Sequence, residues 1–468
     1  MKKVMFVALV AGLSLNAIAQ GLISETIKQE TPSCGSHAYM EHIDHQNPGF
    51  MKLANTHLQD MSTQVVNQKA KKGDDEILEV QVVFHVVYNN AEENIGDSVF
   101  EDQISVLNEC FRRQNADTSN LRPAFDGLVG DALINFKLAT EDPMGNPTNG
   151  VTRTSTSIEY FGGVLPYGQG QNAEIVEWIN DTFYRNISRI SQSDKGGMDP
   201  WDTDRYLNVW VGDLRILEPK VNNAKEILFF ALATPPVGHR NFQNQVGLDE
   251  LFEVLEDGVL MHYPIVGPNN PVLLEAPYNG LNGIITEGEM LVHETGHYLG
   301  LRHIWGDGPC SADDFIDDTP KTNNSSQYVC NSTRNTCVDT INGVDLPDMI
   351  ENYMDYSGSS CMNSFTKGQI WVMREVVRRG RTSFVSTEKL NNDFFNVYPN
   401  PSRTGYTVNL NRFSQNTTFS VLNMQGKVVD TGIVKSQKFK LEINALPGIY
   451  FLEVRNGDIV QRTRVMKL

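Results

Sequence analysis

This sequence has few basic residues, few cysteines and no long apolar run beyond its N-terminal end. Lysine and arginine number 39 against 57 aspartates and glutamates, which gives a formal net charge of −18. Phosphate backbones and anionic lipid heads repel such a surface, so nucleic acid is a poor candidate partner. Cysteine is limited to six residues, too few for a chain of 468 residues held by disulfides alone. Beyond the N-terminal end, no run approaches the ~20 consecutive apolar residues of a membrane helix, so no transmembrane segment is expected.

The N-terminal end has the parts of an export signal. Two lysines precede an apolar run over residues 4–15, and Ala17-Ile18-Ala19 follows it. The run is too short to span a bilayer, so we expect residues 1–19 to be a signal peptide that is removed on export. The polar segment 20–75 ends in a lysine-rich junction open to proteolysis, and we interpret it as a pro-region.

The remaining chain predicts two domains of different class. Between residues 76 and 385, β-branched runs alternate with segments of helical spacing, which is typical of an α/β core. Residues 394–468 hold short alternating runs separated by Asn-Pro, Gln-Gly, Pro-Gly and Asn-Gly turns, which predicts a small all-β domain. In the first domain the expected strands are Leu78–Tyr88, Ile134–Ala139 and Tyr206–Val211, and the expected helices are Asp102–Asn115 and Ile175–Asn186.

The sharpest chemical signal is the run HETGHYLGLRH, residues 293–303. Positions four apart share one face of a helix, so His293 and His297 can point at one tetrahedral zinc ion with Glu294 beside them. The composition gives roughly 4 chance matches in 100,000 chains for the extended pattern. The alternative is a helix whose histidines are ordinary core or surface side chains.

The two ends of this helix also have recognisable signals. Thr286 and Glu289 are spaced as a capping box at its start. Gly300 suits the left-handed turn that ends a helix, and such a turn brings His303 back as a third ligand. Three imidazoles leave the fourth position of zinc to water, whose pKa the metal lowers, and Glu294 can accept the proton. Attack on a peptide carbonyl is then feasible, with Glu294 as general base and afterwards general acid.

These residues resemble a known family. The extended zinc motif, the DDTP segment at 317–320 and the Met-turn-like NYMDY at 352–356 are similar to the pappalysin family of metzincin zinc metalloproteases, over about residues 78–380. The resemblance implies a metzincin-like α/β (α+β) domain with a twisted sheet and an active-site helix. It also implies a secreted endopeptidase made as a zymogen, with one catalytic Zn²⁺ and protein or peptide substrates.

The resemblance assigns roles to further residues. It places Met354 beneath the metal without binding it, and it makes Tyr356 the donor that stabilises the tetrahedral intermediate; from the residues alone, Tyr356 could equally be a buried structural phenol. Four clustered cysteines permit three pairings. The pairs that the resemblance implies are Cys310 with Cys337 and Cys330 with Cys361.

Two other expectations come from the same resemblance. Asp314, Asp318 and Thr319 match a calcium-binding pattern, for which a solvated acidic turn is the alternative. Cys34, followed by glycine, resembles a cysteine switch whose thiolate occupies the fourth position of zinc; a stray or disulfide-bonded cysteine is the alternative. Cys110 is expected to be simply buried.

The chain departs from the family in one respect. Arginine-preferring members have an acid between the Met-turn tyrosine and the last loop cysteine, whereas this chain has Ser-Gly-Ser-Ser at 357–360. An uncharged or small partner in the S1′ pocket is therefore at least as plausible as arginine.

The C-terminal residues 394–468 resemble the sorting domain of type IX secretion, through NVYPNPS at 396–402 and LPGIY at 446–450. The resemblance implies export through the periplasm and outer membrane, with the secretion machinery as a partner, and a secreted or surface-attached product. A carbohydrate-binding or adhesive β-sandwich is the alternative for this domain. For the whole chain the rivals are a silent surface adhesin on a protease-like fold, against which Glu294 argues, and a zinc hydrolase of non-peptide substrates.

Overall fold

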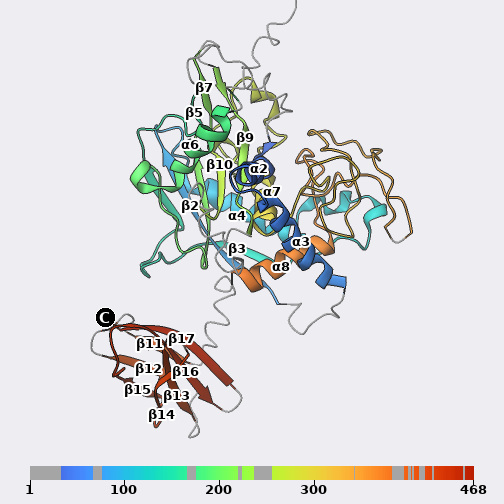
Figure 1. Ribbon diagram of the computed structural model, residues 1–468. Coiled ribbons are helices and arrows are strands. Elements are labelled where there is room, and N and C mark those ends of the chain that lie inside the picture. The colour runs from blue at the N-terminus through green and yellow to red at the C-terminus, as the bar shows by residue number, and fades with distance from the viewer. Residues whose placement is uncertain are drawn as a thin grey trace, which may run out of the picture. The chain divides into compact units, whose positions relative to one another are not determined.

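The computed structural model describes most of the chain between residues 33 and 467 (Figure 1). The expected signal peptide and most of the segment around residues 382–394 lie outside the described residues. The chain divides into two compact units, residues 1–385 and 386–468. None of the described helices is both long and apolar enough to cross a membrane. The described residues are 33–66, 76–165, 175, 177–219, 224–236, 256–341, 343–381, 395–398, 402, 405–410, 417–423, 426–456 and 459–467.

The first unit is built on a seven-stranded sheet in the order β1-β9-β10-β6-β2-β3, with β4 also paired to β2. Strand β2 is parallel to β3, β4 and β6, and the pair β9-β10 is antiparallel. Both faces of β2 are covered, which is why its sequence is nearly all apolar. The three predicted strands are confirmed. The strands are β1 Ser33–Cys34, β2 Leu78–Tyr88, β3 Ile134–Leu138, β4 Val151–Ser155, β6 Tyr206–Gly212, β9 Phe229–Ala233 and β10 Val259–His262.

Helices cover the two faces of this sheet. Alternate residues of β2, such as Val82 and Phe84, share one core with α4 (Asp97–Phe111), α7 (Glu289–Tyr298) and α8 (Lys367–Gly380). The opposite face packs against a helical segment that runs as a π-helix over Ile179–Phe183 and as α6 over Tyr184–Ser188. Both predicted helices are therefore present in the described residues, although α4 begins and ends earlier than its pattern indicated. A small separate sheet contains β5 Gly163–Val164, β7 Ile216–Glu218 and β8 Ala224–Glu226.

The described part of the expected pro-region belongs to the first unit and packs on its sheet and helices. Strand β1 adds to the free edge of β9 in parallel, and α2 (Ser36–Gln46) and α3 (Phe50–Val66) follow it. Helix α2 buries Tyr39 and Ile43 in the same core as Tyr184, and α3 lies beside α8 (Figure 1). This segment is therefore held by backbone pairing and by apolar burial together.

The chain between α7 and α8 is loop-rich, and two disulfides join its turns. They are Cys310–Cys337 and Cys330–Cys361, the pairs that the family resemblance implies. Cys34 and Cys110 are free, and Cys110 is buried as expected. Closing these loops restricts the unfolded chain, so an irregular segment can hold one shape beside the zinc helix.

The second unit is a small β-sandwich, as the sequence predicts. Its sheets have the orders β11-β12-β15 and β14-β13-β16-β17. Residues from both sheets, including Val408 and Leu452, share one core. The strands are β11 Phe395–Tyr398, β12 Tyr406–Leu410, β13 Thr418–Asn423, β14 Val428–Ile433, β15 Lys438–Leu441, β16 Gly448–Asn456 and β17 Ile459–Lys467.

Candidate active site

The zinc-motif helix begins and ends at left-handed glycines. Gly288 precedes it with φ +99°, and Gly300 follows it with φ +96°. The predicted capping box is wrong. The hydroxyl of Thr286 instead accepts a hydrogen bond from the amide of Gly283, and Glu289 accepts one from Ser359. The expected turn at Gly300 is present, and it reverses the chain toward the site.

Three imidazoles converge beyond this turn. The Nε2 atom of His297 lies 3.1 Å from Nε2 of His293 and 3.1 Å from Nε2 of His303. All three rings are buried. Tetrahedral zinc with Zn–N bonds of the usual length sets its nitrogen ligands about 3.3 Å apart, so the three nitrogens fit that ion. Cys34 joins them, because its Sγ and the three ligand nitrogens all lie within 4.8 Å of one another.

The second nitrogen of each ring is also engaged. Nδ1 of His293 donates to the carbonyl of Tyr353 at 2.6 Å, and Nδ1 of His297 donates to the carbonyl of Leu301 at 2.8 Å. Nδ1 of His303 pairs with the carboxylate of Asp307. These contacts hold the proton on Nδ1 and leave Nε2 free to bind a cation. Sequence reasoning missed Asp307, although an acid four residues after the last histidine was a usable signal.

Burial sets the charge of the site. Desolvation, with the neighbouring His303, lowers the pKa of His293 to about 3, and desolvation also holds the pKa of His297 well below its usual value. Both rings are therefore neutral, as metal ligands must be. Desolvation raises the pKa of the wholly buried Glu294 to about 7. A carboxylate poised near neutrality suits proton transfer in both directions.

The pro-region contacts this machinery at several points. Ser36 Oγ donates to Oε2 of Glu294 at 2.9 Å and accepts from the amide of Ala233 at 2.9 Å. Oε1 of Glu294 is buried without a partner among the described residues. The hydroxyl of Tyr356 donates to the carbonyl of Cys34 at 3.3 Å. Burial and the charge of Glu294 raise the pKa of the Cys34 thiol well above its usual value.

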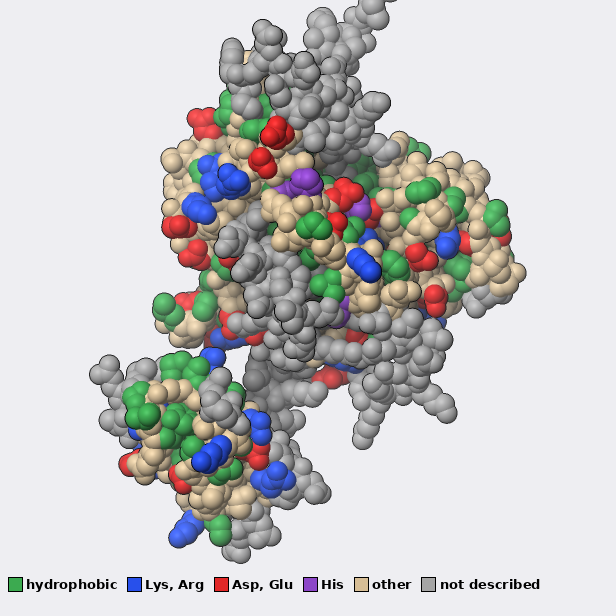
Figure 2. Space-filling model, viewed as in Figure 1, with side chains coloured by type: hydrophobic (Ala, Val, Ile, Leu, Met, Phe, Trp, Pro, Cys, Tyr) green, Lys and Arg blue, Asp and Glu red, His purple; other side chains and the backbone are tan. Residues whose placement is uncertain are grey.

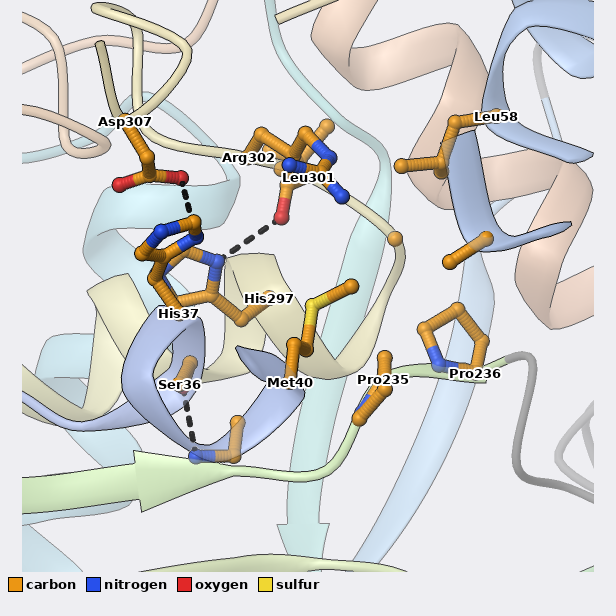
Figure 3. A pocket seen from close by; sticks show the side chains of 13 residues that line it. Ser36, His37, Met40, Leu58, Pro235, Pro236, His297, Leu301, Arg302 and Asp307 are labelled. Carbon is orange, nitrogen blue, oxygen red and sulfur yellow. Dashed lines mark hydrogen bonds and ion pairs between the residues drawn. The ribbon is translucent and has the colours of Figure 1, made fainter. Parts of the chain in front are cut away.

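A further pro-region contact reaches Asp307. Nδ1 of His37 lies 3.2 Å from the Asp307 carboxylate (Figure 3). Its Nε2 lies 3.3 Å from the carboxylate of Glu41. Burial lowers the pKa of His37, but the interactions of its ring with the two acids outweigh burial and raise the pKa to about 9. Histidine and acidic side chains accordingly lie close together on this face of the first unit (Figure 2).

Met354 lies directly against the zinc helix. A Cβ at Gly296 would come within 2.4 Å of Met354 Sδ, so glycine permits the close approach. The rings of His303 and Trp305 stack with their centres 4.2 Å apart, and the ring of Tyr356 lies beside this stack, 4.8 Å from each of them. The structure therefore brings both Met-turn residues to the three histidines.

A pocket of about 280 Å³ adjoins His293 and Tyr356. Residues 357–360 supply no acid to it, as the sequence indicated. Its lining nevertheless includes two acids, Glu289 and Asp355. The hydroxyl of Ser359 donates to the Glu289 carboxylate at 2.8 Å, and the hydroxyl of Ser357 donates to that of the buried Asp355 at 2.7 Å. Burial raises the pKa of Glu289 to about 7. Sequence reasoning missed this acid because it considered only the loop after Tyr356, whereas Glu289 belongs to the zinc helix.

The structure brings together two of the three expected calcium ligands in the acidic loop. Thr319 Oγ1 donates to Asp314 at 2.8 Å, and both side chains are buried. Asp318 turns toward α8, where its Oδ2 accepts from the amide of Gly368 at 2.8 Å and its Oδ1 is buried without a partner. Among the described residues, the only group of three or more histidine, cysteine, aspartate or glutamate side chains close enough to share one metal ion is Cys34 with the three histidines.

Comparisons with known proteins agree with this geometry. A family model described as "Pregnancy-associated plasma protein-A", of the M43 peptidases, matches residues 254–378. A second, described as "Secretion system C-terminal sorting domain", matches residues 396–467.

Curated relatives match over the zinc region. An extracellular metalloprotease of Arthroderma benhamiae is 41% identical over 98 residues, 20% of this chain and 31% of the relative. Extracellular metalloprotease 1 of Coccidioides posadasii is 40% identical over 94 residues, 20% of this chain and 32% of the relative. The chain thus spans about a third of the length of the curated relatives it matches.

Two solved structures match over far more of their length. Mature mirolysin of Tannerella forsythia, in complex with a cleaved peptide, is 36% identical with a TM-score of 0.50, and the match covers 67% of this chain and 98% of mirolysin. A promirolysin mutant of the same organism is 33% identical with a TM-score of 0.53, over 75% of this chain and 97% of that one. The chain therefore belongs to the pappalysin (M43) family of zinc metalloproteases, and its type IX sorting domain assigns it to the cell surface or the exterior.

Proposed function

We propose that this chain is a secreted zinc endopeptidase that hydrolyses extracellular proteins and is made as a latent zymogen. The observation that carries the proposal is the convergence of His293, His297 and His303. The Nε2 atom of His297 lies 3.1 Å from Nε2 of each of the other two. Their donor set, buried and fixed through Nδ1, fits zinc. Glu294 beside them is the group that turns a metal site into a hydrolytic one.

When bound, zinc supplies a Lewis acid that lowers the pKa of water and polarises a carbonyl. The chain's own residues do the rest. Glu294 takes the proton from the attacking water and passes it to the leaving amine, because its carboxylate is buried and its pKa lies near neutrality. The phenol of Tyr356, once it is released from the Cys34 carbonyl, is free to donate to the oxygen that gains charge.

Latency follows from what the pro-region occupies. Cys34 would fill the fourth ligand position, Ser36 covers Glu294, and the Cys34 carbonyl engages Tyr356. One short segment thereby blocks the metal, the base and the oxyanion donor together. We infer an order of signal peptide 1–19, pro-region 20–75, catalytic domain 76–385 and sorting domain 394–468, with the type IX machinery as export partner.

A structural calcium ion is the second part of the proposal. Asp314 and Thr319 are buried together, and the unpartnered Oδ1 of Asp318 is an acceptor that a cation would satisfy. Calcium should raise the melting temperature of the full chain, and Asp318→Asn should reduce that rise. An identical rise in wild type and variant would remove Asp318 from the site.

Peptide digestion tests the main proposal. The full chain, before and after limited proteolysis of the 69–75 junction, is incubated with a mixed peptide library and analysed by mass spectrometry. Cleavage should appear only after proteolysis, stop with a chelator, return with zinc and be absent in Glu294→Ala. A Glu294→Ala protein that digests as fast as wild type would contradict the enzyme assignment. Ester and small amide substrates, run in parallel, separate a peptidase from another zinc hydrolase.

A further inference from the structure

A second cavity lies beside His297 and has a volume of about 440 Å³, counting its open mouth (Figure 3). The pro-region supplies one wall, which includes Met40 and Leu58. The catalytic part supplies the other, from Pro235 after β9 and from the turn that carries Arg302. Loss of the pro-region would therefore open this cavity directly onto the site.

Arg302 lines this cavity from the catalytic part. The Arg302 residue is only 6% exposed. Neither its Nε nor its Nη2 has a hydrogen-bond partner among the described residues. Its guanidinium lies 5.9 Å from the ring centre of Phe315. The two nearby acids have other partners: Asp307 engages His303 and His37, and Asp314 engages Thr319. A buried charge without an acceptor is unfavourable, so an anionic group from outside the described chain would stabilise it.

The free edge of the guanidinium is also the one that recognises carboxylates. Nε and Nη2 form a two-pronged fork, and a carboxylate can accept from both nitrogens at once. Elsewhere in this protein, Nε and Nη2 of Arg112 contact Asp131 in that manner. The unpaired fork of Arg302 therefore favours an aspartate or glutamate side chain over a neutral one.

The pro-region indicates how a peptide would reach this point. Its backbone pairs with the edge strand β9, where the amide of Gly35 donates to Ala231 at 2.8 Å and the amide of Ala233 donates to Ser36 Oγ. Ser36 and His37 then line the cavity. A substrate that replaces β1 on this edge by strand addition places one of its side chains in the same region.

We infer that Arg302 is a specificity-determining residue that selects substrates with an aspartate or glutamate close to the cleaved bond. The inference rests on the proposed peptidase function and adds a substrate class to it. Arg302 lies in a different cavity from Glu289. The preference for acidic side chains at Arg302 and the preference for basic side chains at Glu289 can therefore be measured separately.

Matched peptides test the inference. The activated enzyme receives pairs that differ only by Glu or Gln at one position, for three positions on each side of the cut. The kcat/KM for Glu should exceed that for Gln by about tenfold at one position, and the ratio should fall to about twofold or less in Arg302→Met. Arg302→Lys should give an intermediate ratio. Arg153→Met removes the same charge at the distant pair with Asp97 and should leave the ratio unchanged.

The outcomes separate the two proposals. If no peptide is cleaved by any form, the peptidase function itself is wrong. If peptides are cleaved without an acidic preference, or if Arg302→Met keeps that preference, the role of Arg302 is overturned while the peptidase stands. Zinc content is measured for each variant, because Arg302 precedes the ligand His303. If Arg302→Met does not fold, the Arg302→Lys ratio and the wild-type preference decide the matter.

Discussion

Ser36 and Glu294 are 258 positions apart in the chain, yet the Ser36 hydroxyl donates to the Glu294 carboxylate at 2.9 Å. The same hydroxyl accepts from the amide of Ala233 on the edge strand. One small side chain therefore joins the pro-region, the central sheet and the proposed catalytic base. In the proposed zymogen, this contact is the part of the block that covers the base.

Ser36→Ala should weaken latency. The change removes both hydrogen bonds and leaves a buried carboxylate and a buried amide without partners, which costs about 1–3 kcal/mol in the bound pro-region. We expect measurable peptide cleavage by the intact full chain and faster loss of the pro-region on proteolysis. Ser105→Ala, on the exposed face of α4, is the matched control. Background activity equal to that of wild type would show that Ser36 does not contribute to latency.

Asp307→Asn should weaken zinc binding. The Asp307 carboxylate orients the His303 ring and favours the tautomer with Nε2 free. Loss of such a partner lowers metal affinity by about 10–100-fold. Competition with a chromogenic chelator measures the change, and Asp131→Asn, in a partly exposed ion pair with Arg112, is the control. Equal zinc affinities in wild type and Asp307→Asn would exclude this positioning role.

His37 should make pro-region release depend on pH. Its pKa in the folded zymogen is about 9, raised above the ordinary 6.5 by Asp307 and Glu41. Because the folded pKa is the higher one, the stabilisation is complete below about pH 6.5 and is lost as the pH rises through 9. We therefore expect pro-region digestion to accelerate between pH 7 and about pH 10.

The matching variants are His37→Gln, which should lose this acceleration, and His45→Gln in the exposed last turn of α2, which should keep it. The readout is the rate of pro-region cleavage by an added protease, corrected for that protease's own pH profile. A wild-type rate that is flat over this range would contradict the prediction.

Glu289 should set the charge preference of the pocket beside His293. Its carboxyl group is partly buried and has a pKa of about 7, so it is ionised in mildly alkaline solution, where a lysine or arginine side chain can pair with it. Glu289→Gln should lower kcat/KM for such peptides by about tenfold at pH 8 and affect neutral peptides much less. Glu287→Gln, on the exposed residue just before the helix, is the control. An unchanged ratio of basic to neutral peptides would restore the expectation of an uncharged pocket.

Local spacing explains why much of the site was predictable. His293 and His297 share a face because a helix turns once in 3.6 residues, and Gly300 can adopt the positive φ that returns His303 to them. The strands of the central sheet were equally predictable from the sequence, because β-branched runs such as Leu78–Tyr88 have few other stable conformations when both faces are buried. Each of these features depends on residues close together in the chain.

The start of the zinc helix shows where local reasoning fails. Thr286 and Glu289 have the spacing of a capping box, but Ser359 from a distant loop bonds Glu289, and Thr286 bonds Gly283 instead. The helix begins after Gly288 instead of Thr286, and a tertiary hydrogen bond holds Glu289. A partner far along the chain cannot be inferred from spacing.

The sequence by itself determined the two domain classes and the zinc-ligand motif with its adjacent glutamate, because helical period, turn chemistry and strand alternation act over a few residues. Only the tertiary structure decided that Asp307 supports His303, that Ser36 covers Glu294, and that two guanidinium nitrogens of Arg302 lack a hydrogen bond among the described residues. Those relationships depend on how a sheet edge, a pro-region helix and a disulfide-bonded loop pack together. Packing of that kind is set by the burial of surfaces from the whole chain, and no short segment encodes it.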